Sequence, residues 1–576
     1  PGVPVADREA GPPKVATSVG RGGAVSSVDP YATRIGLRVL KRGGNAVDAA
    51  VATAAALGVT EPFSAGVGGG GYFVHYDARS GKVRTIDGRE TAPAAMPRDA
   101  FIDPETGEPY PFTPDLVTSG VSVGVPGTPA TWTTALRKWG TRSLPAVLRP
   151  AANLARRGFV VDQTFRDQVA QNEERFAAFT STKKLYLRNG LPAVGSRFRN
   201  PDLADTYRRF AQDPRLFVRG KVAGEIVRAV RKPPVTDDTT LPVPPGFMTR
   251  ADLRKYRTLM QKPTKVDYRG LDVYGMAPSS SGGSTVGEAL NILEGLDLDA
   301  MSDADVLHHY LEASALAFAD RGAYVGDPRF TDVPLRDLLS QRFADERACE
   351  LDPEQALTKP VPAGDVTAYD GQCQAPDEAP AATAPDTEGV STTHLTTADR
   401  WGNVVSYTLT IEQTGGSGIV VPGRGFILNN ELTDFSAVYD ESDPNRIQPG
   451  KRPRSSMSPT IVLRNGKPFL ALGSPGGSTI ITTVLQILVD RLERGMTLPE
   501  AVADPRGTQR NTASVTAEPA FIETYGDLLA PYGHQLTDGG EIGAATGIEF
   551  RRRGVMVAVS EPERRGGGAA MVVRPR

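Results

Sequence analysis

The chain contains 576 residues, of which 39% are hydrophobic and 23% are charged, a composition typical of a globular protein with two or more domains or one large layered unit. It carries 65 basic and 67 acidic residues, and the resulting net charge of −2 indicates no broad cationic face for nucleic acid. The longest apolar run, from Ala49 to Val59, is far shorter than the roughly 20 residues that span a bilayer, so the sequence predicts no membrane span.

The first part of the chain predicts helices around one hairpin. Residues 29–58 have the pattern of two helices, because Asp29 can cap the first, Pro30 suits its first turn and Gly43-Gly44 can end it. Residues 68–90 place strand-like residues on both sides of a Ser-Gly turn, which predicts a hairpin. A helical section follows between residues 128 and 327. Residues 358–391 are rich in Pro, Ala and Asp and poor in large apolar side chains, and they predict a mobile segment.

The second part predicts strands and then a helix. Strands are expected at 392–399 and 404–411 around a short turn, and a second hairpin over 458–474 turns at Asn465-Gly466. Residues 478–495 have the pattern of an amphipathic helix that Gly495 ends. We therefore expect a layered protein with largely antiparallel sheets and helices outside them.

The cysteines and the first residue bear on the compartment. Only Cys349 and Cys373 occur, which excludes a Cys-rich zinc site and leaves one disulfide open but not required. The sequence begins with Pro1 and not with Met, so we expect that an export segment has been removed and that the protein is secreted or periplasmic.

Thr392 is the candidate nucleophile. A Thr hydroxyl is a poor nucleophile without a base, but the α-amine of an N-terminal Thr can be that base, and its pKa of about 7.7–8.0 leaves much of it neutral near physiological pH. This chemistry requires a cut between Ser391 and Thr392, and the predicted mobile segment is a natural place for one. The alternative is that Thr392 is an ordinary strand residue, because Thr has a high strand propensity.

Two further motifs supply groups that acyl transfer needs. Gly476 and Gly477 lie between a predicted strand and a predicted helix, where their N–H groups can point at an oxyanion; a tight turn is the alternative. Glu431 and Asp434 can hold an ammonium group, or they lie in a solvated turn.

Groups that suit a carboxylate occur in two other motifs. The planar fork of Arg89 fits a carboxylate bidentately, although a surface position at a strand end is the alternative. Ser455 and Ser456 offer hydroxyl donors beside such a carboxylate, or form a capped turn.

These motifs occur together in the order of one family. The segments that resemble γ-glutamyltransferase (γ-glutamyltranspeptidase) are DGRETAP, TTHLTTADRWGNVVSYTLTIEQTGGSGI, GFILNNELTDFS, KRPRSSMSPTIV and GSPGGSTIITTV. The resemblance implies an α+β fold, a four-layer αββα sandwich of the N-terminal-nucleophile hydrolase type, formed by both subunits of a self-cleaved precursor. It also implies a large subunit of residues 1–391, with 358–391 as its processing segment, and a small catalytic subunit of residues 392–576.

The resemblance implies catalytic roles residue by residue. Thr392 matches the nucleophile, and Thr410 matches a Thr that hydrogen-bonds near it and aids processing. Gly476 and Gly477 match the pair that forms the oxyanion hole, and the cut falls between Ser391 and Thr392.

It also implies how the substrate is held. The residues that match the cradle for the substrate α-carboxylate are Arg89, Ser455 and Ser456. The residues that fall where the family binds the α-ammonium group are Glu412, Glu431 and Asp434. Many members have Asn in place of Glu412 and Gln in place of Glu431, so the extra negative charge predicts an affinity that depends more strongly on pH and salt. A short connection after residue 438 predicts an open site that admits bulky leaving groups.

The implied reaction cleaves γ-glutamyl amides such as glutathione through a γ-glutamyl-Thr392 ester. The acyl group then passes to water or to the amine of an amino acid or peptide, and no metal or organic cofactor takes part. Two alternatives remain at this point: an acylase of the same fold that acts on glutaryl, β-lactam or other biosynthetic acyl groups, and a non-catalytic homologue that binds glutamate.

Overall fold

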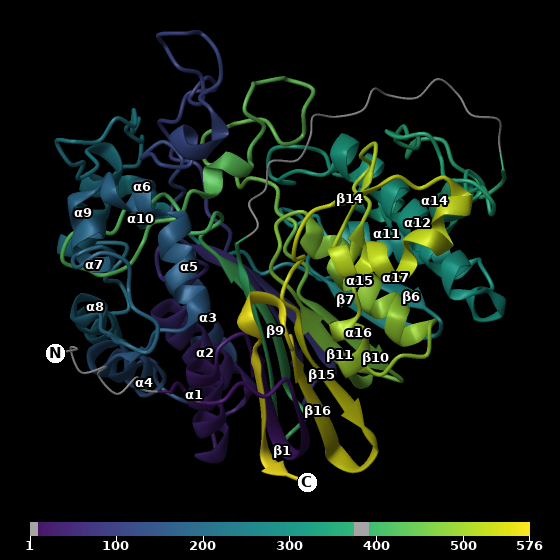
Figure 1. Ribbon diagram of the computed structural model, residues 1–576, viewed down its shortest axis with the longest axis horizontal. Coiled ribbons are helices and arrows are strands. Elements are labelled where there is room, and N and C mark those ends of the chain that lie inside the picture. The colour runs from purple at the N-terminus through teal and green to yellow at the C-terminus, as the bar shows by residue number, and fades with distance from the viewer. Residues whose placement is uncertain (1–9, 374–390) are drawn as a thin grey trace, which may run out of the picture.

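The computed structural model describes residues 10–373 and 391–576. Two layers of strands lie between two layers of helices (Figure 1), as the expected αββα sandwich requires. Of the predicted mobile segment, residues 374–390 lie outside the described residues.

The described residues form one large sheet of twelve strands, and every pair in it is antiparallel. The strand order is β3-β2-β9-β8-β1-β16-β15-β11-β10-β7-β6, with β17 paired to β1. The strands are β1 (Thr17–Ser27), β2 (Gly70–Asp77), β3 (Lys82–Asp87), β6 (Thr264–Tyr268), β7 (Leu271–Gly275), β8 (Thr393–Asp399), β9 (Val404–Thr410), β10 (Thr460–Arg464), β11 (Lys467–Gly473), β15 (Thr546–Arg551), β16 (Val555–Ser560) and β17 (Ala569–Pro575). Smaller sheets contain β4 (Phe159–Val160), β5 (Arg197–Phe198), β12 (Gly507–Thr508), β13 (Val515–Ala517) and β14 (Leu536–Asp538).

Strand β1 joins the two halves of the sandwich. Its first residues pair with β16 and its last residues pair with β8, and the pairing with β17 shifts register between Arg21 and Ala24. A bulge of this kind bends a strand and increases its twist. The sheet therefore turns back on itself, and β8 and β9 pack against β11 and β15.

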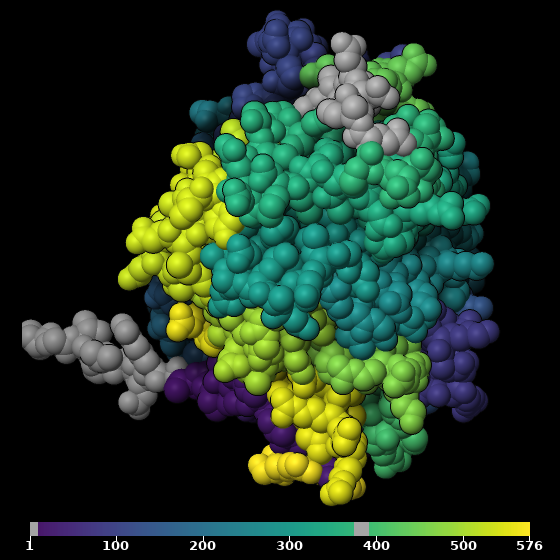
Figure 2. All heavy atoms as spheres, turned by 90° about the vertical axis from the view of Figure 1, so that its right-hand side faces the viewer, coloured from purple at the N-terminus to yellow at the C-terminus, as the bar shows by residue number. Residues whose placement is uncertain are grey.

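Within the described residues, helices α1–α10 cover one side of the sandwich and helices α11–α17 cover the other. The first layer contains α1 (Pro30–Lys41), α2 (Ala46–Thr60), α3 (Thr128–Trp139), α4 (Leu144–Arg157), α5 (Gln163–Gln171), α6 (Glu173–Ala177), α7 (Thr180–Tyr186), α8 (Pro201–Gln212), α9 (Gly220–Arg231) and α10 (Arg250–Lys255). The second contains α11 (Gly282–Glu294), α12 (Asp303–Tyr324), α13 (Leu335–Leu338), α14 (Gln341–Ala348), α15 (Thr479–Leu492), α16 (Leu498–Ala503) and α17 (Pro519–Leu529). In the direction of Figure 2 the second layer of helices faces the viewer.

Side chains along β9 alternate between the helices of the first layer and the space between the two strand layers. Val405, Tyr407 and Leu409 pack with the helices of the first layer. Because neighbouring side chains of a strand point to opposite faces, Thr408 and Thr410 face the space between the two strand layers. This places a row of threonine hydroxyls between the two strand layers.

The local predictions are confirmed in most cases. The Asp29 side chain accepts a hydrogen bond from the Ala32 N–H at 2.8 Å and caps α1, and both predicted hairpins are present as β2–β3 and β10–β11. The amphipathic pattern predicted for 478–495 is wrong, although α15 is a helix. Every residue of α15 from Ile480 to Asp490 is buried, because the helix packs between the sheet and α11, α12 and α16.

The described part of the predicted mobile segment, residues 358–373, has no helix or strand but makes specific contacts. The Lys359 ammonium pairs with Glu312, and the Val361 N–H donates to Asn511 Oδ1 at 2.7 Å. Cys349 and Cys373 form a disulfide, which settles the pairing that the sequence left open.

Among the helices of the described residues, none is both long and apolar enough to cross a membrane.

Candidate active site

Thr392 lies immediately before β8, against the carbonyl that precedes it. Its hydroxyl donates toward the Ser391 carbonyl oxygen and lies 3.0 Å from Thr410 Oγ1. The Thr410 hydroxyl lies 3.1 Å from the same carbonyl oxygen. All three residues are buried, so the two hydroxyls and the carbonyl form one group shielded from bulk water.

The strand pairing explains why residues 18 positions apart meet here. Thr393 of β8 lies opposite Leu409 of β9, so Thr392 and Thr410 are the next opposed pair beyond the ladder. On the other side, Thr410 pairs with Gly70 of β2. The nearby Gly69 has no room for a side chain, because a Cβ there would lie 1.9 Å from the Thr410 carbonyl oxygen. The glycine run of 68–71 thus lets β2 approach the site closely.

Glu412 contacts the hydroxyl of Thr410. Its N–H donates to Thr410 Oγ1 at 2.8 Å, and Asn430 Nδ2 donates to its carboxylate. Glu412 has a φ of 78°, a left-handed conformation that is uncommon for residues other than glycine. The backbone therefore leaves β9 in a strained turn that aims this carboxylate toward the segment carrying Glu431.

The arginine predicted to bind the substrate carboxylate contacts two of the acidic residues predicted to bind the substrate ammonium group. The Arg89 guanidinium pairs with Glu431 through Nη1 and with Asp434 through Nη2. Arg89 also donates to the carbonyl oxygens of Pro453 and Arg454, at 3.1 and 2.8 Å. The alternatives of a surface arginine and a solvated turn are wrong, because all three charged side chains are at most 4% exposed.

Burial and charge set the protonation of this cluster. Burial lowers the pKa of Arg89, but the carboxylates of Glu431 and Asp434 outweigh that effect and the pKa lies well above its ordinary value. Burial, and then the charge of Glu431, raise the pKa of the neighbouring Glu90 well above its ordinary value. Both effects favour the neutral form of Glu90 beside Glu431.

Ser455 and Ser456 adjoin the cluster through the chain that carries the Arg454 carbonyl. Ser455 forms a parallel bridge with Ser280, and its hydroxyl accepts a hydrogen bond from the Met457 N–H at 3.2 Å. The Ser456 hydroxyl accepts one from Arg321 Nη2 at 2.8 Å. Both serines are buried beside the arginine that the sequence assigned to the same carboxylate.

Gly476 and Gly477 lie in the connection from β11 to α15. Their φ angles are 138° and 59°, so the connection uses conformations that favour glycine. Both residues are buried, and within the described chain neither N–H donates a hydrogen bond. Buried N–H groups without an acceptor are rare, which fits a pair of donors held for a bound oxyanion. No hydrogen bond joins them to Thr392 in that part of the chain.

His394 follows Thr392 by two positions and is buried between the two strand layers. Its Nδ1 lies 2.8 Å from Thr408 Oγ1, and a Cβ on Gly473 of β11 would lie 2.4 Å from the imidazole. Burial lowers the pKa of His394 to about 3, so the imidazole is neutral at physiological pH. These contacts are those of a packed structural residue.

Sequence reasoning missed three residues of this site, namely Glu90, Asn430 and Arg565. Arg565 Nη1 donates to the Thr392 carbonyl oxygen at 2.7 Å from a position 173 residues away. Burial lowers the pKa of Arg565, and the charge of Glu61 opposes that effect. Arg565 stands in the segment VAVSEPERRGGG, whose sequence gives no sign of which arginine reaches Thr392.

The described residues contain no group of three His, Cys, Asp or Glu side chains that could hold a metal ion. The arrangement has other means to activate an acyl group: a hydroxyl beside a peptide carbonyl, a second hydroxyl on the same oxygen, and paired charges for a zwitterion. A four-layer sandwich with a threonine placed in this way before an inner strand defines a hydrolase of the N-terminal-nucleophile type.

Comparisons with known proteins place the chain more narrowly. The family model for gamma-glutamyltranspeptidase matches residues 32–571 of this chain. The glutathione hydrolase proenzyme of Bacillus subtilis (strain 168) is 39% identical over 560 residues, which cover 95% of this chain and 91% of that protein. The chain belongs to the gamma-glutamyltranspeptidase family.

Acylases are also among the similar proteins. An acylase ACY 1 proenzyme from Pseudomonas sp. (strain V22) is 33% identical over 556 residues, covering 94% of this chain and 92% of that protein. The crystal structure of a cephalosporin acylase from Bacillus halodurans matches with a TM-score of 0.83 and 29% identity, and the match covers 99% of each chain.

Proposed function

We propose that this protein is a self-processing γ-glutamyl hydrolase and transferase whose nucleophile is Thr392. The observation that carries the proposal is the contact of two hydroxyls, those of Thr392 and Thr410, with the carbonyl oxygen of Ser391. These contacts hold the Thr392 hydroxyl beside the peptide bond that it would attack, and they supply a donor for the carbonyl oxygen. The family and the names of its members, glutathione hydrolase proenzymes among them, support both the processing and the substrate.

Processing begins when Thr392 Oγ1 attacks the carbonyl carbon of Ser391. The carbon–nitrogen bond breaks, the nitrogen of Thr392 takes up the proton that the hydroxyl gives up, and an ester joins Ser391 to the Thr392 oxygen. Water then hydrolyses the ester, which leaves a carboxylate on Ser391 and a free α-amine on Thr392. Throughout, the Thr410 hydroxyl donates to the oxygen on which negative charge develops. The products are a large subunit of residues 1–391 and a small subunit of residues 392–576, which stay together as a heterodimer.

A γ-glutamyl group can replace the internal ion pairs of the empty site. Its α-carboxylate would take the place of Glu431 and Asp434 on Arg89, and its α-ammonium would pair with those two carboxylates and with Glu412. The exchange keeps every buried charge paired, which burial of charges requires. With both ends of the α-carbon held, the γ-carbonyl is oriented toward Thr392.

Turnover then uses the new N-terminus. The α-amine of Thr392 accepts the hydroxyl proton as Oγ1 attacks the γ-carbonyl, and the N–H groups of Gly476 and Gly477 stabilise the oxyanion, at about 3 kcal/mol per good donor. The leaving amine, cysteinylglycine in the case of glutathione, takes the proton and departs. Water or the amine of an amino acid or peptide then receives the acyl group.

The Cys349–Cys373 disulfide supports a secreted or periplasmic location, because disulfides persist in oxidising compartments.

The position of the cut is tested by the N-terminal residue of the small fragment. We expect Thr392 at that position, and we expect Thr392→Ala to remain a single full-length chain without activity toward γ-glutamyl anilides. The matched control is Thr393→Ala, the next residue along the strand, which should still be cleaved. A small fragment that begins elsewhere, or cleavage of Thr392→Ala, would contradict the proposal. An intact native chain at neutral pH would instead favour a non-catalytic glutamate-binding homologue.

The similarity to acylases favours one second candidate, an enzyme that removes glutaryl or β-lactam acyl groups. A glutaryl group lacks the α-ammonium, so it would take Arg89 away from Glu431 and Asp434 and leave their charges unpaired. We therefore expect faster release of p-nitroaniline from the γ-glutamyl anilide than from the glutaryl anilide. The reverse order would favour the acylase.

A further inference from the structure

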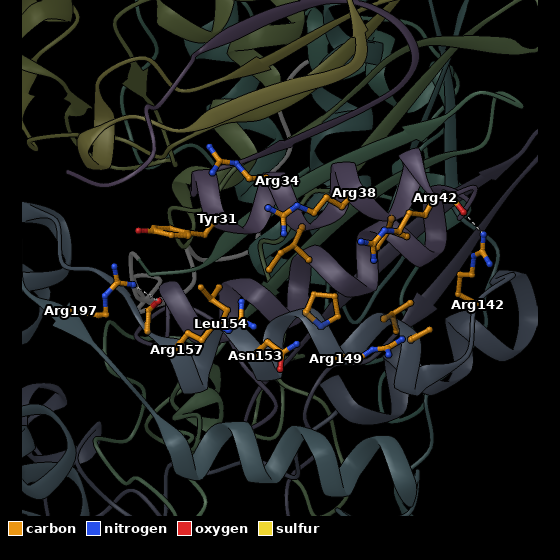
Figure 3. A pocket seen from close by; sticks show the side chains of 16 residues that line it. Tyr31, Arg34, Arg38, Arg42, Arg142, Arg149, Asn153, Leu154, Arg157 and Arg197 are labelled. Atoms are coloured by element: carbon orange, nitrogen blue, oxygen red, sulfur yellow. Dashed lines mark hydrogen bonds between the residues drawn. The ribbon is translucent and has the colours of Figure 1, made fainter. Parts of the chain in front are cut away.

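The outer layer of helices contains a groove lined by arginines. It lies between α1 and α4 and has a volume of about 750 Å³. Arg34, Arg38 and Arg42 line one side along α1, and Arg149, Asn153 and Arg157 line the other along α4 (Figure 3). We call this the arginine groove. Its lining includes no acidic residue and none of the residues assigned to the active site.

The two sides of the groove repeat at the same interval. Each side has polar groups four residues apart, and four residues of an α-helix rise about 6 Å along its axis. Figure 3 shows the labelled side chains following the two helices, with Leu154 between the two sides. The apolar residues Ile35 and Val39 of α1 also line the groove. The groove therefore presents two rows of positive charge over an apolar floor.

Helix capping explains two of the arginines that line the groove. Arg142 donates to the Arg42 carbonyl oxygen at the end of α1, and Arg197 Nη1 donates to the Gly158 carbonyl oxygen at the end of α4, at 3.3 Å. The charges of Arg42 and Arg157 also lie near those helix C-termini, where a positive charge is favourable.

Capping does not explain Arg34 and Arg149, which lie farther from the helix ends. Across residues 10–373 and 391–576, no side chain forms an ion pair or hydrogen bond with the guanidinium groups of Arg34, Arg38, Arg42, Arg149 or Arg157. Five like charges without a carboxylate partner create a positive potential that attracts an anion.

We infer that the arginine groove binds an acidic polypeptide segment, at a site separate from the γ-glutamyl site. In an extended chain, side chains on one side repeat every 6.6–6.8 Å, an approximate match to the interval of the arginines. Carboxylates suit the guanidinium fork bidentately, and the apolar floor accepts the methylene groups of glutamate side chains.

The lining favours a peptide over a single-stranded nucleic acid. Nucleic acid of this kind is held by aromatic side chains on which successive bases stack. Tyr31 is the one aromatic residue of the groove, and Figure 3 shows it at one end beside Arg34. A row of bases would therefore find charge for its phosphates but only one ring for stacking.

The test measures the fluorescence anisotropy of a labelled, α-linked deca-glutamate peptide titrated with the processed enzyme at low and high salt. We expect saturable binding that weakens as salt rises, because the contacts are surface ion pairs. In the double variant Arg38→Glu/Arg149→Glu, one change on each side, the Kd should rise by about tenfold or more.

The control is Lys82→Glu/Arg84→Glu, two exposed residues of β3, which changes the net charge by the same amount. Its Kd should stay within about twofold of the native value, and both variants should keep native turnover of a γ-glutamyl anilide. An equal loss of affinity in the control, or no binding by the native protein, would overturn the inference. Tighter binding of an oligothymidylate of equal charge would assign the groove to nucleic acid instead.

Discussion

At the scale of single residues, the direction in which the Thr410 hydroxyl donates sets its role in the proposed cleavage of the chain. The Glu412 N–H donates to Thr410 Oγ1, which leaves the hydroxyl proton of Thr410 free to point at its acceptor, the Ser391 carbonyl oxygen. The Thr392 oxygen, 3.0 Å from Thr410 Oγ1, keeps a lone pair for attack. In the proposed cleavage, Thr410 is thus the donor to the oxygen that gains charge, and Thr392 is the attacking group.

Thr410→Val should therefore slow cleavage while leaving the fold intact. Valine keeps the shape of threonine but removes the donor, and loss of one such donor lowers a rate by about 10²–10³-fold. The control is Thr408→Val on the same face of β9, whose hydroxyl contacts His394 and not Ser391. A time course on denaturing gels checks both variants. Cleavage of Thr410→Val at the native rate would contradict the role given to its hydroxyl.

The role of a residue could be predicted from the sequence only where the evidence for it lies in neighbouring residues of the chain. Arg89, Glu431 and Asp434 stand in motifs that mark them as ligands, but nothing local indicates that they pair with each other while the site is empty. Arg565 was missed because its contact with Thr392 crosses 173 residues. A charged residue near a chain end has no sequence pattern that separates a buried contact from a surface position.

At the scale of elements, the connection from β11 to α15 sets the position of the proposed oxyanion donors. The sequence predicted the strand, the glycines and the helix, because hairpin and helix signals are local. It predicted an exposed face on α15 that is absent, because burial of that helix depends on α11, α12 and α16. The buried helix is a firm support for the two glycine N–H groups at its start.

Gly476→Ala should lower kcat in the cleaved protein. A φ of 138° is strained for alanine, and the new Cβ would lie 2.5 Å from Thr479 Oγ1, so the peptide groups of the connection must turn. We expect kcat to fall by about 10²-fold with a smaller change in KM, because the donors act mainly in the transition state.

Gly495→Ala is the matched control for that change. Gly495 has a φ of 70° just after the other end of α15 and open space where a Cβ would stand, so it adds backbone strain away from the site. Steady-state kinetics with a γ-glutamyl anilide compare the two. Equal values of kcat in the two variants would show that the connection does not carry the donors.

At the scale of the whole molecule, the strand order could not be read from the sequence. Antiparallel layers followed from the hairpins, but β2 meets β9 across more than 300 residues, as the contact of His75 with the Val404 carbonyl shows. Pairings of this kind depend on tertiary packing and leave no local pattern. The strand order nevertheless decides what a cut at Ser391 does to the protein.

Strands from the two sides of Ser391 are interleaved in the large sheet. Five pairs join them: β2 with β9, β8 with β1, β1 with β16, β1 with β17, and β10 with β7. Separation of the fragments would break all five ladders and expose the core between the strand layers.

Cleavage should therefore leave one particle with the mass of the full chain in size-exclusion chromatography with light scattering. It should unfold in a single transition, in which loss of helix and release of the small fragment coincide. The uncut Thr392→Ala chain provides the comparison and should elute at the same volume. Fragments that elute apart in native buffer would show that the ladders do not hold the cleaved protein together.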